Sequence, residues 1–194
     1  DRPGSPYDDE VDNYSQTHFQ LFYNKLTEVG EWTLTGFYTR GNGFFENYKG
    51  GETLSDYNFF PIDSLSGDTI REDDIIRRKW LDNHFYGANV NFQTGGEKYE
   101  LKLGAHVSRF QGGHYGTIIQ TDQLKRFRFP FEYYRNDAVK HGASVFAKLQ
   151  YEVIENLFAY GDLQYRLVDY SYGDGTDEDG VMRKGEVQYH FVNP

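Results

Sequence analysis

The sequence predicts an all-β protein, built as an antiparallel up-and-down meander of about seven strands. Three observations predict this fold class: long segments in which apolar and polar residues alternate, a regular succession of short and long connections, and a composition rich in tyrosine, phenylalanine and glycine. The 194-residue chain contains 17 tyrosines, 16 phenylalanines and 21 glycines but a single methionine. Such a composition favours strands over helices.

Each predicted strand spans on the order of ten residues or more, compared with ~5–6 in most globular proteins. Tilted strands that cross a membrane need about 9–11. The segments are 12–26, 31–42, 80–94, 98–110, 139–152, 156–171 and 181–192.

Several of these segments alternate in polarity from one residue to the next. In segment 98–110, every second residue from Tyr99 to Val107 is apolar, whereas the residues between them, from Glu100 to Ser108, are polar or small. A period of two over this length indicates strands with one apolar and one polar face.

The connections alternate between short and long. The short ones are 27–30, 94–97 and 153–156, and the long ones are 43–79, 111–138 and 172–180. The first two long connections exceed the usual length of loops in compact domains. Outer-membrane barrels have short turns on one rim and long loops on the other, so this order favours the wall of a transmembrane barrel.

Aromatic residues lie near the ends of the predicted strands. Tyr23, Trp32, Tyr99 and Tyr151 lie beside the short turns, and Tyr38 and Trp80 lie toward the long loops. Such residues form girdles at the two interfaces of a membrane barrel. They also pair across strands in ordinary sheets, but the alternating connections favour the girdle.

Composition and motifs exclude several other classes. The formal charge of −10 comes without a basic stripe, so we expect no nucleic-acid partner. The chain has no cysteine, which excludes a disulfide scaffold, and no apolar run long enough for a membrane helix. No serine lies in a nucleophile elbow. We therefore expect neither an enzyme nor a cofactor.

The candidate ligand-binding residues are aromatic residues and one histidine on the first two long connections. They are Phe44, Phe45, Tyr48, Tyr57, His114, Tyr115, Tyr133 and Tyr134. Exposed rings can stack on sugars or aromatic chelates and contribute a large contact area. The alternative is that these rings pack the loops together over the mouth of the barrel, and the sequence leaves both open.

The third long connection is acidic, and Asp174, Asp177 and Asp179 are weak candidates for binding a cation. Calcium favours carboxylates on a glycine-rich turn, but Gly175 stands where the calcium-loop pattern needs an acid. We therefore predict a solvated loop and no metal site.

Parts of the sequence resemble the barrel of TonB-dependent outer-membrane receptors of the Bacteroides type. The closest resemblance is in Arg77–Gly87 (RRKWLDNHFYG), and Asp9–Tyr14, Tyr38–Glu46 and Gly161–Arg166 are also similar to that family. The resemblance implies a transmembrane barrel of about 22 strands, with a lumen that a plug domain fills. Residues 1–194 are then expected to be an internal piece of that barrel in a longer protein, without the plug and without a signal peptide.

The resemblance also implies a function and partners. The protein would be a receptor in the outer membrane of a Gram-negative cell, in contact with outer-membrane lipid. It would actively import a scarce small-molecule or glycan nutrient, such as an iron chelate, a corrinoid or a glycan, and would meet the TonB complex through the plug region. The isolated fragment is expected to self-associate through its open sheet edges. The alternative is a soluble β-sandwich that binds ligands in the manner of a carbohydrate-binding module, with its apolar face covered by a second sheet.

Overall fold

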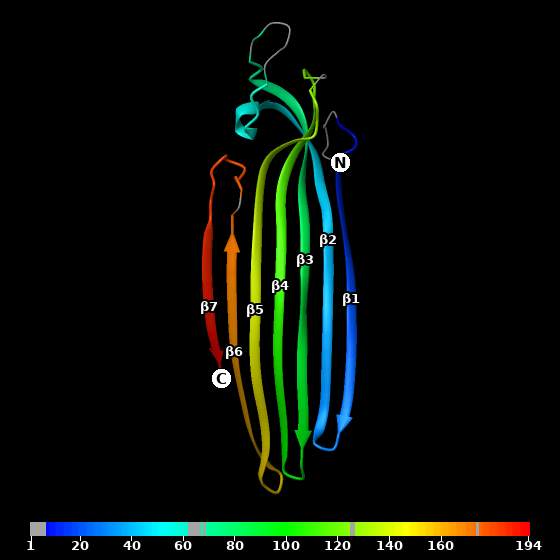
Figure 1. The fold of residues 1–194 in the computed structure, drawn as a ribbon, viewed down its shortest axis with the longest axis vertical. Helices are drawn as coiled ribbons and strands as arrows, with labels where there is room; N and C mark the ends of the chain where they lie inside the picture. Colours follow the sequence, from blue (N-terminus) through cyan, green and yellow to red (C-terminus); the bar gives the residue numbers. More distant parts are fainter. Residues whose placement is uncertain (1–6, 62–66, 68, 125–126, 174) are drawn as a thin grey trace.

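The computed structural model describes residues 7–61, 67, 69–124, 127–173 and 175–194. These residues form one antiparallel sheet of seven strands that lie side by side in chain order (Figure 1). The strands are β1 (Val11–Thr27), β2 (Gly30–Thr53), β3 (Glu72–Gly95), β4 (Tyr99–Thr121), β5 (Phe131–Ile154), β6 (Leu157–Tyr172) and β7 (Gly185–Asn193). The predicted all-β meander is confirmed. The sheet is open, with β1 and β7 at its edges.

Three tight turns join the strands at one end of the sheet, at the bottom of Figure 1. Thr27 pairs with Gly30 across the first turn, and the Thr27 hydroxyl donates to the Gly30 carbonyl at 2.7 Å. In the second turn, the Gly96 amide donates to the Tyr99 carbonyl at 2.9 Å. The third turn contains Asn156 in the left-handed region, at φ 63°, a conformation that asparagine tolerates better than most residues.

The strands run further into the long connections than the sequence predicts. Strand β2 continues to Thr53 and β3 begins at Glu72, so the first connection is 54–71 and not 43–79. Strand β4 continues to Thr121 and β5 begins at Phe131, so the second connection is 122–130 and not 111–138. The third connection is 173–184, and the last strand begins later than the predicted residue 181.

Glycines explain why these strand extensions were mistaken for loops. Gly116 pairs with Tyr134 near the long-loop end of the β4–β5 ladder, next to a shift in the register. A side chain on Gly116 would overlap the rings of Tyr133 and Tyr134. Glycine is therefore required there by close packing of rings against the strand, although in a sequence it usually indicates a break.

The two faces of the sheet can be followed through the strand register, because directly opposed residues in antiparallel strands point to the same face. One row crosses the whole sheet: Tyr23, Leu34, Val90, Ala105, Val145, Tyr165 and Val192. We call the face that carries this row the apolar face. The opposite face carries rows such as Thr35, Asn89, His106, Ser144 and Arg166, and we call it the polar face.

Strand β7 departs from this pattern. Its residues Val187, Tyr189 and Phe191 pair with Tyr170, Val168 and Arg166, so they lie on the polar face. The alternation of the inner strands is therefore not continued at this edge of the sheet.

A small hydrophobic core lies at the long-loop end of the sheet, which is at the top of Figure 1. A 3₁₀ turn, η1 (Leu54–Tyr57), packs there against β3, β4 and the start of β5. We call this core the loop cluster; its buried members are Leu54, Tyr57, Phe59, Ile75, Ile118 and Tyr133. Leu54, Ile75 and Ile118 are completely buried.

Candidate functional site: the two faces and the long-loop end

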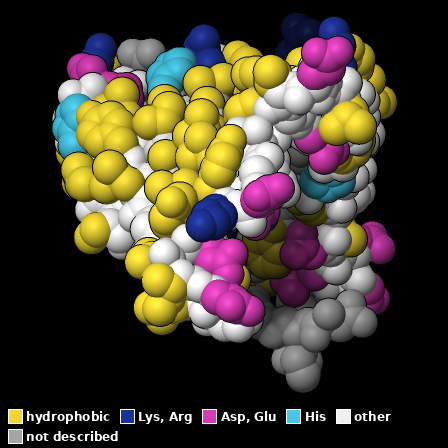
Figure 2. Space-filling view, turned by 90° about the horizontal axis from the view of Figure 1, so that it is seen from below, with side chains coloured by type: hydrophobic (Ala, Val, Ile, Leu, Met, Phe, Trp, Pro, Cys, Tyr) yellow, Lys and Arg dark blue, Asp and Glu magenta, His cyan; other side chains and the backbone are white. Residues whose placement is uncertain are grey.

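An apolar band crosses the apolar face in the half of the sheet next to the short turns. Its members on β2 to β6 are Trp32, Leu34, Ala88, Val90, Phe92, Leu101, Leu103, Ala105, Val107, Ala143, Val145, Ala147, Leu149, Leu163, Tyr165 and Leu167. Many of these side chains are exposed: Val145 is 54% and Leu163 is 56% accessible. Viewed from the short-turn end, hydrophobic side chains gather in a broad patch with charged side chains at its margins (Figure 2).

The surface area indicates how unusual this exposure is. The chain has an accessible surface of 13154 Å². A compact protein of 22.7 kDa is expected to expose roughly 9,500 Å². Monomeric soluble proteins rarely leave a continuous apolar surface of this kind uncovered. The apolar band is therefore the first candidate for a functional surface of this fold.

The band ends abruptly although the strands continue. Toward the long loops, the row with Phe19, Tyr38 and Tyr86 is followed on the same face by Arg40 and His84. The Tyr38 hydroxyl lies 2.8 Å from Nδ1 of His84. The apolar face thus changes from aliphatic to aromatic to charged within a few residues.

Charged residues above the band are paired with one another. Arg40 forms an ion pair with Asp82 on the neighbouring strand β3. The Arg40 guanidinium also donates to the carbonyl of Asn83 at 3.1 Å. These contacts fix the charged row that borders the band on β2 and β3.

The polar face holds its side chains through lateral hydrogen bonds. His106 lies 2.7 Å from Oδ1 of Asn89 and 2.9 Å from the hydroxyl of Ser108. Lys148 and Asp162 pair at 3.0 Å across β5 and β6. Hydrogen-bonding groups are therefore gathered on the side opposite the band.

Three of the predicted ligand-binding residues belong to the packing of the loops. Tyr57 and Tyr133 meet edge to face at 4.9 Å, and Tyr133 and Tyr134 at 5.0 Å. The Tyr57 hydroxyl donates to Glu52 at 2.5 Å. Burial and this hydrogen bond raise the pKa of Tyr57 well above its usual value. For these three rings, the structure matches the alternative in which aromatic residues pack the loops together.

Phe44 and Tyr115 lie on the apolar face, above the band, on either side of Trp80. The Phe44 and Trp80 rings are 4.6 Å apart, and Trp80 and Tyr115 are parallel at 5.8 Å. Arg78 lies 4.2 Å from the centre of the Phe44 ring, and Arg135 lies 4.2 Å from that of Tyr115. The two guanidinium groups therefore cover ring faces that would otherwise be open to a ligand.

Tyr48 is engaged in a hydrogen bond between β2 and β3, next to the first connection. Its hydroxyl donates to Asp74 at 2.5 Å, and Asp74 also accepts from the Gly51 amide at 2.8 Å. This arrangement closes the end of the β2–β3 hairpin. Tyr48 thus has a local structural contact.

Phe45 and His114 line a hollow of about 360 Å³ on the polar face near the long loops. Lys79 and Glu178 also line it, and their ion pair at 2.5 Å ties β3 to the third connection. Phe45 is 46% exposed. Of the predicted ring residues, Phe45 is the one most accessible to a ligand in this hollow.

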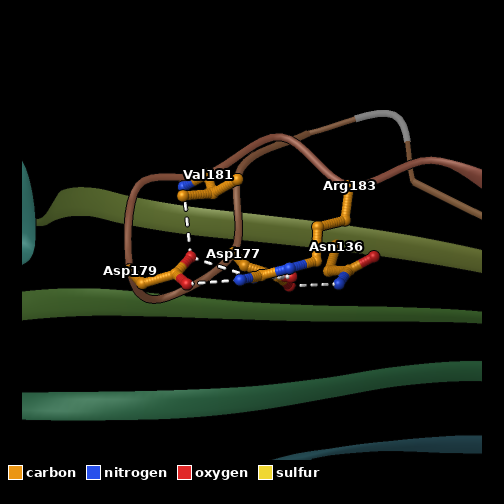
Figure 3. Close-up of polar contacts among 5 residues, drawn as sticks. All are labelled: Asn136, Asp177, Asp179, Val181 and Arg183. Carbon is orange, nitrogen blue, oxygen red and sulfur yellow. Dashed lines mark hydrogen bonds and ion pairs between the residues drawn. The ribbon is translucent and has the colours of Figure 1, made fainter.

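The acidic loop is organised around Arg183 (Figure 3). The guanidinium of Arg183 lies 2.7 Å from Asp177 and 2.5 Å from Asp179. Asn136 donates to Asp177 at 2.5 Å, and the Val181 amide donates to Asp179 at 3.1 Å. An arginine therefore occupies the position between the carboxylates where a cation would bind.

Asp174, the third weak candidate for cation binding, lies outside the described residues. The described residues contain no group of three or more His, Cys, Asp or Glu side chains placed to hold a metal ion. The pKa of Asp179 is lowered because Arg183 hydrogen-bonds to its carboxylate.

The structure adds a hollow that the sequence analysis missed. It has a volume of about 610 Å³ and lies on the polar face over β3 to β6. Its lining includes Phe85, Phe110, Lys140, Gly142, Arg166 and Tyr170. These residues come from four strands and point to the same face of the sheet. Finding them in the sequence would therefore require the exact pairing of residues between the strands.

Comparison with known proteins adds no relative. A scan against models of protein families finds no match, and no curated protein matches the chain. Among the residues that the structure describes, no helix is long and apolar enough to cross a membrane. The established result is an open antiparallel sheet with one apolar and one polar face.

Proposed function

We propose that this chain is part of the β-barrel wall of a TonB-dependent outer-membrane receptor that imports a scarce nutrient. The observation that carries the proposal is the limited height of the apolar band. It covers successive rows across the inner strands and ends at aromatic and then charged residues, while the strands themselves continue. The hydrocarbon core of a bilayer is about 30 Å thick, which would limit an apolar band to such a height. The core of a soluble protein sets no such limit.

The two ends of the sheet support the same assignment. All three tight turns lie at one end, and all longer connections lie at the other (Figure 1). Strands β2, β3 and β5 each have 24 residues, more than the about 9–11 that cross a membrane. The surplus lies on the long-loop side, where receptors of this type extend beyond the membrane to capture ligands.

A soluble β-sandwich needs a second sheet over the apolar face. All seven strands of the described residues belong to one sheet, and no other element of that part of the chain covers the band. Membrane lipid is the cover that this surface fits best. Nutrient specificity among iron chelates, corrinoids and glycans would then depend on the polar face and the long loops.

The membrane assignment is tested by two neighbouring substitutions on β2. Leu34 lies in the apolar band, and Thr35 lies next to it on the polar face. We expect Leu34→Arg to destabilise insertion by about 2–4 kcal/mol, the effect of a cation at the membrane midplane of a barrel. Thr35→Arg should be tolerated. The measurement is the amount of intact protein in the outer-membrane fraction of a Gram-negative cell, with folding followed by mobility on gels before and after heating.

Equal effects of the two substitutions, or a stable soluble monomer of the intact protein in detergent-free buffer, would contradict membrane insertion. The transport function has a separate test. Cells that lack this protein and cells that lack the energy-transducing inner-membrane complex should lose growth on the same limiting nutrient, from a panel of ferric chelates, cobalamin and glycans. Uptake that persists without the inner-membrane complex would contradict a TonB-dependent mechanism.

A further inference from the structure

We propose that the 610 Å³ hollow on the polar face binds an acidic sugar, with Lys140 and Arg166 as the cations that pair with its carboxylate groups. The inference rests on the proposed function, because the polar face then lines the lumen of the barrel. It adds a substrate class and the residues that recognise it. The volume lies within the ~300–1,000 Å³ range of small-molecule sites.

The charge of the hollow is the first argument. The chain as a whole carries a formal charge of −10, yet the lining contains two cations and no aspartate or glutamate. Lys148, on the same face of β5, is paired with Asp162. By contrast, Lys140 and Arg166 have no ion pair or side-chain hydrogen bond among the described residues. Two unpaired cations beside one hollow favour an anionic ligand.

The shape of the hollow is the second argument. Phe85, Phe110 and Tyr170 contribute aromatic rings from three different strands. Gly142 forms part of the lining between them, and its lack of a side chain leaves room close to the backbone. Rings beside an open strip offer flat, apolar surfaces on which a sugar ring can stack.

The remaining groups favour a sugar over a purely aromatic acid. Ser108, Ser144 and Gln164 also line the hollow, together with His106, which is fixed by hydrogen bonds to Asn89 and Ser108. These side chains supply donors and acceptors for several hydroxyl groups. An aromatic acid would use the rings and the cations but would leave most of these polar groups without a partner.

The hollow lies at a suitable height for a transport pathway. Phe85, Phe110, Lys140 and Tyr170 form one row of the polar face. That row lies beside Tyr86, at the upper border of the apolar band. A ligand in this hollow would therefore be inside the barrel, at the level of the upper border of the apolar band.

The test measures binding of a hexuronate disaccharide to the intact protein in detergent micelles by isothermal titration calorimetry. A neutral disaccharide of the same linkage and salicylate serve as comparison ligands. We expect the acidic sugar to bind with an affinity that falls as the salt concentration rises. The affinity of the neutral sugar should be lower by a factor of about ten or more.

The variants are Lys140→Gln and Arg166→Gln, separately and together. Each should weaken hexuronate binding by about tenfold. The matched control is Lys98→Gln, which changes the net charge equally but lies in the turn at the opposite end of the sheet. Lys98→Gln should bind like the unmodified protein, and circular dichroism and heat-dependent mobility show whether each variant is folded.

Several results would overturn the proposal. They are the absence of hexuronate binding at millimolar concentration, equal binding of the neutral sugar, tighter binding of salicylate, or the same weakening by Lys98→Gln. These outcomes differ from failure of the proposed function, which the paired substitutions at Leu34 and Thr35 test without any ligand. If the barrel inserts normally but does not bind hexuronate, the membrane assignment stands and the proposed substrate class is wrong.

Discussion

The loop cluster and the apolar band both consist of apolar side chains, but they differ in whether other parts of the chain cover these side chains. Ile118 in the loop cluster is completely buried, whereas Val107, on the same strand β4, is 56% exposed. In the loop cluster, the chain supplies its own cover through η1 and the rings of neighbouring segments. Across the band, the residues that the structure describes supply no cover. The difference supports the proposal that the long-loop end faces water and that the band, next to the short turns, faces an apolar surrounding.

The largest expected effect comes from a pair of truncations on β4. Ile118→Ala should destabilise the loop cluster by about 2–5 kcal/mol, because it leaves a cavity in close packing. Val107→Ala should change stability by about 0.5 kcal/mol or less in detergent, since its surroundings are fluid. Denaturant unfolding of the intact protein in micelles, together with limited proteolysis near Leu124, measures both. Equal losses would remove the distinction between the two regions.

The sequence predicts the band better than the loop cluster, and the reason is geometric. The alternation from Tyr99 to Val107 is visible within a single segment, so the strand and its two faces follow from local residues. Leu54, Ile75 and Ile118 come from distant positions, and nothing near any of them indicates a shared core. Their contact depends on the register of β3 and β4.

The same reasoning explains the candidate site. The sequence analysis placed the candidate ligand-binding residues on long connections, but all except Tyr57 lie in strands β2, β4 and β5, and their contacts depend on strand parity and on neighbouring residues. Tyr57 and Tyr133 pack in the loop cluster, whereas Phe45 faces a hollow. The larger hollow escaped prediction because its lining comes from four strands, with at most four residues from any one.

An effect of intermediate size is expected when alkaline pH destabilises the loop cluster, and the residue concerned is Tyr57. Burial and the hydrogen bond to Glu52 raise the pKa of Tyr57 in the folded protein, whereas an unfolded tyrosine titrates near about 10. The folded state therefore keeps a proton that the unfolded state loses. The stabilisation is complete below about pH 10 and is lost as pH rises through the higher folded pKa.

Tyrosinate absorbance and proteolysis of the first connection, followed from pH 8 upward, measure this loss. Tyr57→Phe should destabilise the loop cluster at neutral pH by about 1–2 kcal/mol, because the hydrogen bond to Glu52 is removed. It should also reduce the alkaline sensitivity of the first connection. An unchanged alkaline transition in Tyr57→Phe would show that Tyr57 is not the group responsible.

The smallest effect is expected at Arg183, which is exposed and belongs to neither region. Its guanidinium joins Asp177 and Asp179, but exposed ion pairs are screened by water and salt. Arg183→Gln should therefore speed amide exchange at Val181 by roughly fivefold at most, without altering the loop cluster or membrane insertion. Asp179→Asn removes one of the two carboxylate partners and should have a similar effect. If Arg183 organises the loop through these carboxylates, the double variant should exchange little faster than either single variant, whereas fully multiplicative effects would contradict that coupling.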